Sequence, residues 1–430
     1  MHTMKILRQL IGVLLAVLCL VGCNLPVAGP VTPVAATFTA APAESLQTQT
    51  SPPSGPVEVT GTAEAAPAAV AAVKISLDTP QQIFHYQKSD AMGLFNVPDM
   101  HTAVLQEPDK SYLLWITGNI GPSGGSVARL ATKDFIQYTD AGPAGSKRVM
   151  PVFTPSCPDD KPACLAIYDA KYVGANSVVR ASNGKDLLMF YEAGNQAVGD
   201  QPVPHWEYNV MALALSTDEG LTWTRRGPVV SGSDPTPTAV GTSQPGISEP
   251  GIVVAKRFMY MFFQYVPNQD SEPEAPSVIQ AARASLASDG APGAWKKYYN
   301  GAWTEDGLGG KASTIVATGK GSGCTRPVQV WPVFSDYLNA YVLTFLCNEG
   351  WFFSTSTDLV TWTAPVNFMP MPMWRSCQPM DWNFILVTPG KPAGVIGQTG
   401  LVLYAHSDQK GLNCGNFDAH ELWVRGFKFQ

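Results

Sequence analysis

Tyr208 to Arg226 reads YNVMALALSTDEGLTWTRR and places strand, turn and strand signals in one short segment. Val210 to Leu215 is apolar at every position, which is typical of a strand buried on both faces. A turn follows at Ser216 to Gly220, where the Asp218 carboxylate can accept backbone N–H bonds and the glycine is free to take a positive φ. Trp223 begins the next strand. The segment therefore predicts two antiparallel strands joined by a tight turn.

The spacing Ser-x-Asp-x-Gly-x-x-Trp in this segment resembles the Asp-box of sialidases and related β-propellers. In that motif the polar residues hold a hairpin turn and the Trp packs between sheets. The resemblance implies a structural role for Asp218 and says nothing about a substrate.

The first residues of the sequence predict an export signal. Lys5 and Arg8 precede an apolar run from Ile11 to Val21. This run is too short for a membrane-spanning helix, which needs about 20 residues. Leu20-Val21-Gly22-Cys23 resembles the lipobox of bacterial lipoproteins, in which the cysteine is lipidated and becomes the mature N-terminus. We therefore expect a signal peptide over residues 1–23, lipidation at Cys23, and a protein anchored outside the cytoplasm. An ordinary signal peptide with a chance cysteine is the alternative.

Composition divides the rest of the chain into a tether and one folded domain. Residues 24–75 are rich in Pro, Ala and Thr and nearly free of aromatic side chains, so they bury too little apolar surface to offset chain entropy. Residues 76–430 contain no comparable linker and are expected to form one domain. The chain carries 28 Lys and Arg against 34 Asp and Glu, which leaves no basic surface for a nucleic-acid partner.

The cysteines are consistent with export. Six lie beyond the lipobox, and an even number outside the cytoplasm indicates disulfides rather than metal ligands. We expect sequential pairing of Cys157 with Cys164, Cys324 with Cys347, and Cys377 with Cys414. No Cys-x-x-Cys or His-x-x-x-His spacing predicts a metal site.

Short strand-like runs separated by turns recur in five units. The units cover about residues 102–138, 177–226, 251–295, 328–362 and 384–427. Asp134, Asp218, Asp289 and Asp358 occupy the turns of the first four units and lie 84, 71 and 69 residues apart. This spacing predicts an all-β, five-bladed β-propeller, in which antiparallel blades surround a central channel. A β-sandwich is the competing fold, but it does not predict a five-fold recurrence.

Acidic residues precede the first strands of two units. Val97-Pro98-Asp99-Met100-His101 begins the first unit, and Gly246-Ile247-Ser248-Glu249-Pro250-Gly251 begins the third. Together with turns at 132–138 and 356–362, these segments make residues 80 to 430 resemble glycoside hydrolase family 43 and its five-bladed relatives of families 32 and 68. The resemblance implies that Asp99 is a general base and Glu249 a general acid.

The second unit departs from the family. In that family, an Asp before the first strand of the second blade orients the general acid and tunes its pKa. This sequence reads Ala175-Asn176-Ser177-Val178 at that position. Asp169 lies slightly upstream and is the candidate for this role; otherwise the role is lost. Hydrolysis with inversion needs a protonated acid and a carboxylate roughly 6.5–9.5 Å apart, a separation that Glu249 and Asp99 can meet across a narrow channel.

Further candidates have lower weight. Five residues near first-strand starts or in loops are candidates for sugar binding by hydrogen bonds or ring stacking: His101, Arg326, Asp381, Trp206 and Trp382. Glu192, Asp200 and His205 surround a Gly- and Pro-rich loop between strands of the second unit. We expect a solvated loop there, and a rim of the pocket is the alternative. No cofactor is required; a structural Ca²⁺ is compatible with the fold but unsupported by the sequence.

The sequence therefore predicts a lipid-anchored glycoside hydrolase-like monomer that acts on oligo- or polysaccharide. The resemblance implies an arabinosyl or xylosyl linkage cleaved by an inverting two-carboxylate mechanism. A non-catalytic carbohydrate-binding or surface-interaction propeller is the alternative, favoured by the unmatched acid of the second unit. A sialidase-like enzyme is a second alternative, although the sequence lacks a convincing arginine triad and has five units where sialidases need six.

Overall fold

The computed structural model of the chain describes residues 73–85, 91–120, 123–145, 147–157, 168–196, 207–233, 246–267, 277–319, 321–371, 379–407 and 421–430. This part of the chain is all-β. None of its helices is long and apolar enough to cross a membrane. The predicted signal peptide with Cys23 and nearly all of the predicted tether lie outside the described residues.

The strands are mostly seven to ten residues long in the body of the fold and shorter at its edges. In chain order they are β1 (Ile75–Leu77), β2 (Gln81–Gln82), β3 (Leu94–Phe95), β4 (Ala103–Gln106), β5 (Tyr112–Ile120), β6 (Ser123–Thr132), β7 (Tyr138–Asp140), β8 (Pro151–Phe153), β9 (Tyr172–Arg180), β10 (Leu187–Gln196), β11 (Glu207–Ser216), β12 (Thr224–Val230), β13 (Gly246–Ala255), β14 (Phe258–Val266), β15 (Val278–Ser285), β16 (Lys296–Tyr299), β17 (Ala302–Asp306), β18 (Val328–Ser335), β19 (Ala340–Cys347), β20 (Gly350–Ser356), β21 (Val366–Pro370), β22 (Met380–Val387), β23 (Val395–Ile396), β24 (Thr399–Ser407) and β25 (Glu421–Phe429). A 3₁₀ helix, η2 (Leu286–Ser288), follows β15.

Pairing is antiparallel with two short exceptions. β3 to β8 form one sheet, β18 to β21 with β23 another, and β22, β24 and β25 a third that also contains β1 and β2. The remaining sheet has nine strands in two antiparallel sets, β9–β12 and β13–β17. Among the described residues, a parallel bridge between Asn209 and Gly246 joins the two sets. β1 pairs with β25, from Ile75 opposite Phe429 to Leu77 opposite Phe427, so the first strand of the domain lies beside its last.

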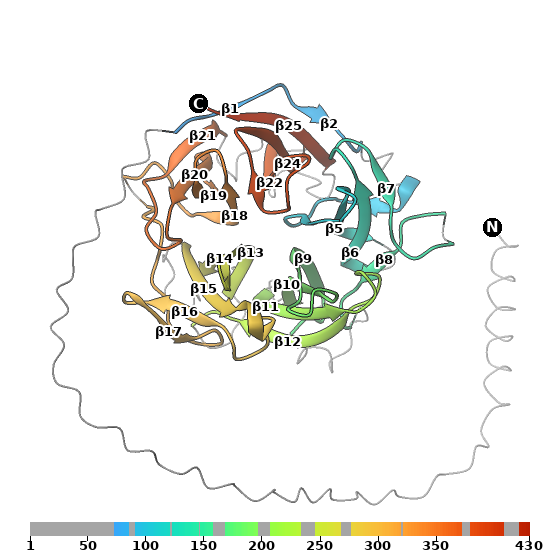
Figure 1. Ribbon diagram of the computed structural model, residues 1–430, viewed down its shortest axis with the longest axis horizontal. Coiled ribbons are helices and arrows are strands. Elements are labelled where there is room, and N and C mark those ends of the chain that lie inside the picture. The colour runs from blue at the N-terminus through green and yellow to red at the C-terminus, as the bar shows by residue number, and fades with distance from the viewer. Residues whose placement is uncertain are drawn as a thin grey trace, which may run out of the picture. The chain divides into compact units, whose positions relative to one another are not determined.

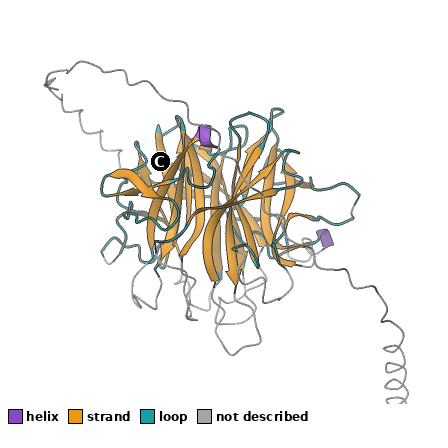
Figure 2. Cartoon of the chain, turned by 90° about the horizontal axis from the view of Figure 1, so that it is seen from below, coloured by secondary structure: helices purple, strands orange, loops and turns teal. Residues whose placement is uncertain are grey.

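The sheets surround a common centre. Figure 1 shows β9, β13, β18 and β22 nearest to this centre, with β12, β17, β21 and β25 outermost. In the view turned by 90°, the strands run between the two faces of the ring and the connections lie at the faces (Figure 2). We call β4, β9, β13, β18 and β22 the first strands.

Apolar residues on both sides of each sheet explain this arrangement. In β10, Met189 and Tyr191 point toward the sheet of β5 and β6, while Leu188 and Phe190 point toward β13 and β14. Alternate side chains of a strand face opposite sides. A strand that is apolar on both faces therefore needs a neighbouring sheet on each side. β11 has the same pattern, as predicted for residues 210–215.

The predicted turns are held by their own acidic side chains. Asp218 Oδ1 accepts a bond from Thr222 N (2.9 Å), and Ser216 Oγ accepts one from Gly220 N (2.8 Å). The carboxylates of Asp134 and Asp358 likewise accept backbone N–H groups two and three residues ahead. These three carboxylates therefore stabilise outer turns, which agrees with the structural role predicted for them.

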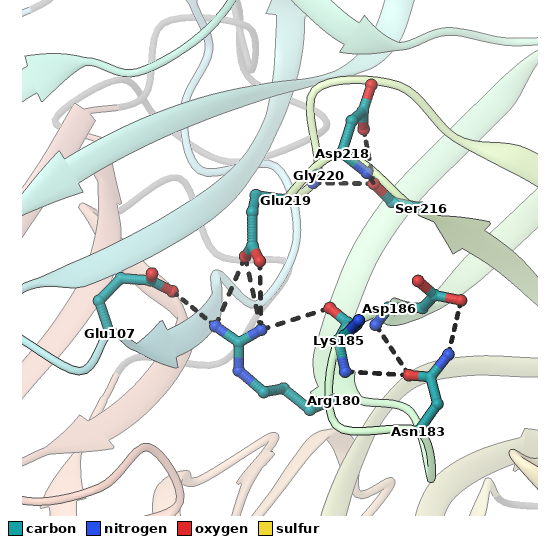
Figure 3. Close-up of polar contacts among 9 residues, drawn as sticks. All are labelled: Glu107, Arg180, Asn183, Lys185, Asp186, Ser216, Asp218, Glu219 and Gly220. Carbon is teal, nitrogen blue, oxygen red and sulfur yellow. Dashed lines mark hydrogen bonds and ion pairs between the residues drawn. The ribbon is translucent and has the colours of Figure 1, made fainter.

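The turn after β11 also contacts the preceding sheet. Glu219 forms an ion pair with Arg180 (3.4 Å), which in turn contacts Glu107 after β4 (3.2 Å) (Figure 3). Asp289 differs from the other turn residues. Its carboxylate accepts bonds from the backbone and hydroxyl of Ser182, so it links the two antiparallel sets of the nine-stranded sheet instead of closing its own turn.

Candidate functional site

Each of four first strands carries a bulge in its N-terminal half. The antiparallel register skips Asn176 in β9, and it shifts at Glu249 in β13, Gln329 in β18 and Asn383 in β22. A bulge leaves its residue out of the ladder and redirects the side chain. Glu249, Gln329 and Asn383 have positive φ values of 46°, 57° and 57°. The repeated bulge therefore takes one polar residue of each of these strands out of the regular ladder.

Hydrogen bonds connect these residues around the centre. Gln329 Nε2 donates to Glu249 Oε1 (3.0 Å), and Gln329 Oε1 accepts the backbone N–H of Asn383 (3.0 Å). Asn383 Nδ2 donates to the carbonyl of Pro98, the residue before Asp99 (3.4 Å). A polar chain thus runs from β13 through β18 and β22 to the segment before β4.

The Glu249 carboxyl has a raised pKa. The side chain is half-buried, yet protein surrounds it closely enough that burial raises its pKa from 4.5 to about 7. Hydrogen bonds from the side chain and backbone of Gln329 act in the opposite direction and lower the pKa. A carboxyl with this pKa can hold a proton at neutral pH and give it up, which is the requirement for a general acid.

Glu192 is the second carboxylate of the network, and the sequence-based expectation for it was wrong. It lies in β10 and is only 4% exposed, not in a solvated loop. Its carboxylate accepts bonds from Asn209 Nδ2 (2.8 Å), Ser248 Oγ (3.0 Å) and the backbone N–H of Glu249 (2.5 Å). A lone acidic residue within the apolar run LLMFYEAG was the available signal for a buried role.

Asp99 lies at the other end of the polar chain. It is half-buried, and its backbone N–H donates to the carbonyl of Thr117 (2.9 Å). Its neighbour Pro98 receives the Asn383 bond, so Asp99 and Glu249 belong to the same ring of first-strand residues. The backbone next to Asp99 is therefore connected to Glu249 through Asn383 and Gln329.

His101 lies inside the protein and not on an open pocket surface. It is fully buried with its ring 5.2 Å from that of Trp331, and burial lowers its pKa to about 3, so the imidazole is neutral. The ring lies against the backbone of Gln329, but neither nitrogen has a hydrogen bond of normal geometry among the described residues. Asn176 Nδ2 and Asn383 Oδ1 are also buried without partners there. Such polar groups are typical sites for buried water.

Asp169 occupies a different environment from the one predicted. It is fully buried, with Oδ2 2.5 Å from Arg225 Nε and 3.1 Å from the Tyr191 hydroxyl. Tyr191 and Glu192 are adjacent in β10, so their side chains point to opposite faces of the sheet. Asp169 therefore belongs to an ion pair on one face, while Glu192 and Glu249 meet on the other.

The remaining binding candidates are dispersed. Asp381 Oδ1 lies 2.5 Å from His406 Nδ1, and both side chains are largely buried. Arg326 is exposed, immediately before β18. Trp382 is 2% exposed and belongs to the apolar core, so it is not available to stack on a sugar. Trp206 lies outside the described residues.

A disulfide joins the segment before β18 to the end of β19. Cys324 is bonded to Cys347 in β19, which is one of the three sequential pairs expected. Cys157 is disulfide-bonded as well, and Cys164, Cys377 and Cys414 lie outside the described residues. Within the described ranges, no three His, Cys, Asp or Glu residues form a group able to hold a metal ion.

No protein-family model and no curated protein matches this sequence. Among solved structures, similar chains include the catalytic domain of a family 62 α-L-arabinofuranosidase from Coprinopsis cinerea, with 11% identity, a TM-score of 0.45, and coverage of 82% of this chain and 96% of the other. A family 117 glycoside hydrolase from Zobellia galactanivorans has 11% identity and a TM-score of 0.47, covering 83% and 90%. An α-L-arabinofuranosidase from Lactobacillus brevis has 10% identity and a TM-score of 0.48, covering 80% and 94%.

Proposed function

We propose that this domain is a five-bladed β-propeller. The nine-stranded sheet separates into two antiparallel sets, and counting these as separate blades adds two to the three other sheets. Each blade then has one of the five first strands, and the bulges recur at equivalent positions in four of them. The pairing of β1 with β25 closes the ring between the ends of the domain.

We further propose that the protein is a glycoside hydrolase in which Glu249 is the general acid and Asp99 the general base. The observation that carries this proposal is the Glu249 carboxyl, whose pKa of about 7 and bulged position at the ring suit it to protonate a leaving glycosidic oxygen. In an inverting reaction, the Asp99 carboxylate activates a water that attacks from the opposite side of the sugar. The sequence resemblance to family 43 supports an arabinosyl or xylosyl linkage.

The location of the enzyme is part of the proposal. The apolar run before Cys23 and the Pro-, Ala- and Thr-rich residues 24–75 support a lipid-anchored protein outside the cytoplasm, with the domain of residues 76–430 held on a tether. The Cys324–Cys347 disulfide is compatible with an oxidising compartment. Such an enzyme acts as a monomer on oligo- or polysaccharide near the cell surface.

The test compares Glu249→Gln and Asp99→Asn with the wild type on arabinan, arabinoxylan and xylan. We expect release of arabinose or xylose to fall by about 10²–10⁴-fold in each variant, the usual contribution of a general acid or base. Glu219→Gln, in an outer turn, is the matched control and keeps wild-type activity. Proton NMR of the first product formed reports the anomer and tests inversion. Unchanged turnover in Glu249→Gln would remove this residue as the acid.

A non-catalytic carbohydrate-binding propeller is the second candidate. Two observations favour it: the first strand of the second blade carries Asn176, and Asp169 is held by Arg225. Calorimetric titration with xylo- and arabino-oligosaccharides separates the two functions. Binding by the wild type without any turnover supports the second candidate, whereas turnover that depends on Glu249 excludes it.

A further inference from the structure

A cavity of about 290 Å³ lies between the first strands, along the part of each strand that follows its bulge. All five first strands contribute to its lining, among other residues through Val104 of β4, Val178 of β9, Ile252 of β13, Pro332 of β18 and Leu386 of β22. The bulged residues Glu249, Gln329 and Asn383 do not line it. The cavity is therefore central to the ring and separate from the polar chain of the candidate site.

The cavity opens to solvent beside the turn between β13 and β14. Lys256 in this turn lines the cavity and is exposed, and Val254 just before it lines the cavity with 45% of its surface exposed. The connections at this end of the first strands all belong to the described residues, over 107–111, 181–186, 256–257, 336–339 and 388–398. The mouth is therefore fully described.

The walls of the cavity are apolar. Val, Ile, Leu, Ala, Pro, Phe and Trp side chains make up most of the lining. Ser177 is one of the few polar lining residues, and its hydroxyl already accepts the backbone N–H of Ile252 (3.1 Å). An apolar cavity of about 150 Å³ in another protein holds benzene instead of water. Because this cavity has about twice that volume, it suits an apolar ligand of about twelve non-hydrogen atoms.

Lys256 is the charged residue of the lining. Its ammonium group forms no hydrogen bond or ion pair with another described residue. Other charges in the connections at this end are already paired, since Lys391 bonds Asp336, and Arg180 bonds Glu107 and Glu219. The mouth of an apolar cavity thus offers one cation whose partner is not supplied by the described residues.

We propose that this cavity is a binding site for a small apolar carboxylate, whose hydrocarbon part lies between the first strands and whose carboxylate pairs with Lys256. A free sugar does not suit the cavity, because its hydroxyl groups would lose their hydrogen bonds to water against apolar walls. The cation at the mouth disfavours a positively charged amphiphile. The inference goes beyond the proposed hydrolase and does not depend on it, since the cavity and the polar chain of Glu249 are lined by different residues.

Two kinds of compound combine this chemistry with a suitable size, a medium-chain fatty acid and an aryl carboxylate. Octanoate and trans-cinnamate, with about ten non-hydrogen atoms each, are the probes. Octan-1-ol is the neutral probe of similar length. Calorimetric titration of the full chain with each compound is expected to show saturable binding at one site for the carboxylates, and the tighter of the two identifies the shape that the cavity prefers. No saturable binding of either carboxylate at millimolar concentration would overturn the proposal.

The role of Lys256 is tested against its neighbour in the same turn. Arg257 is also exposed but does not line the cavity, and its guanidinium lies over the ring of Phe258. We expect Lys256→Glu to raise the dissociation constant of the carboxylates about five- to tenfold, because a solvent-screened attraction becomes a repulsion. Arg257→Glu should change it by less than about twofold, and octan-1-ol should bind the wild type and both variants equally. Equal weakening of carboxylate binding in the two variants would overturn the pairing with Lys256.

A larger side chain at the mouth tests the location. Val254→Trp fills part of the cavity from a position that is already 45% exposed, and Val366→Trp, in the outer strand β21 with 39% exposure, is the matched control. We expect binding of octanoate or cinnamate to weaken by more than about tenfold in Val254→Trp and to stay at the wild-type level in Val366→Trp. Unchanged binding in a folded Val254→Trp would overturn the location, and the Lys256 and Arg257 variants keep the proposal testable if Val254→Trp does not fold. A wild type that binds a carboxylate but cleaves no sugar supports this site and overturns only the proposed hydrolase.

Discussion

Gln329 links Glu249 to Asn383 through a single amide group. Its Nε2 lies 3.0 Å from Glu249 Oε1, and its Oε1 lies 3.0 Å from the backbone nitrogen of Asn383. Gln329 is 1% exposed, so its amide makes both hydrogen bonds from a buried position. Burial raises the pKa of Glu249, and the Gln329 bond limits the increase. These two opposing effects therefore keep the pKa of the Glu249 carboxyl close to neutral pH.

The raised pKa predicts that Glu249 costs stability at alkaline pH. Its pKa is about 7 in the folded protein and 4.5 without burial, so the folded state binds more protons between these values. Stability then falls as pH rises through this window and stays lower above it. Replacing Glu249 with Gln removes the cost while keeping an oxygen for Gln329. We expect a gain of up to about 3 kcal/mol at pH 8 and little change at pH 4.5.

Thermal and urea unfolding at pH 4.5 and pH 8 measure this difference. Glu219→Gln, whose side chain is half exposed, is the control and shows no comparable dependence on pH. Equal effects of Glu249→Gln at the two pH values would mean that the carboxyl is not perturbed in the folded protein.

The turn and strand pattern of this chain was readable from its sequence, because it depends on local chemistry. Asp218 and Gly220 have the short-range roles that their residue types predict. Asp289 had the same local pattern, but its carboxylate accepts a hydrogen bond from Ser182, which follows β9 in the other antiparallel set of the nine-stranded sheet. A contact between residues 107 positions apart is not encoded in the turn itself.

The site was only partly predictable for the same reason. Glu249 lies in the first strand β13 and Asp99 precedes the first strand β4, as the strand pattern predicts. Glu192 was missed because an alternating strand does not reveal which acidic residue faces a neighbouring bulge. Asp169 was a candidate for tuning the acid because the sequence does not show its pairing with Arg225, which lies 56 residues away.

The Asp169–Arg225 pair predicts a large effect on stability. Asp169 is fully buried, and Arg225 Nε lies 2.5 Å from its carboxylate while the guanidinium lies over the ring of Phe153. Removing Arg225 leaves a buried negative charge without its partner. We expect Arg225→Met to lower the free energy of unfolding by about 3–5 kcal/mol. Chemical denaturation followed by tryptophan fluorescence measures this loss.

A double-mutant cycle checks the origin of the effect. Asp169→Asn combined with Arg225→Met should cost less than the sum of the single substitutions, since neither leaves an unpaired charge once both are made. Additive costs would show that the residues do not interact. Sugar binding by Asp169→Asn is expected to equal that of the wild type, because the pair lies on the other face of the sheet from Glu249.

Gly220 is required at the turn after β11 for two reasons. Its φ is 82°, and a Cβ at this position would overlap the indole of Trp115 on the preceding sheet. Gly184 has a similar φ of 70° but nothing within 4 Å of its added Cβ, so it is a matched control. We expect Gly184→Ala to cost about 1 kcal/mol and Gly220→Ala about 2–4 kcal/mol. Equal losses in urea unfolding would mean that contact with Trp115 does not constrain the turn.

The Cys324–Cys347 disulfide predicts a third measurable contribution to stability. It joins the segment before β18 to the end of β19 across 23 positions, and both residues are buried. Closing a loop of this length restricts the unfolded chain and stabilises the fold by about 3 kcal/mol. The double substitution of both cysteines by Ala removes the bond without burying a new polar group. Its free energy of unfolding should fall by about this amount. Arg326→Ala, at an exposed position inside the same loop, is the near-neutral control. A double variant as stable as the wild type would show that the hydrogen bonds around Cys324, including Gly319 N to its carbonyl, hold this segment without the cross-link.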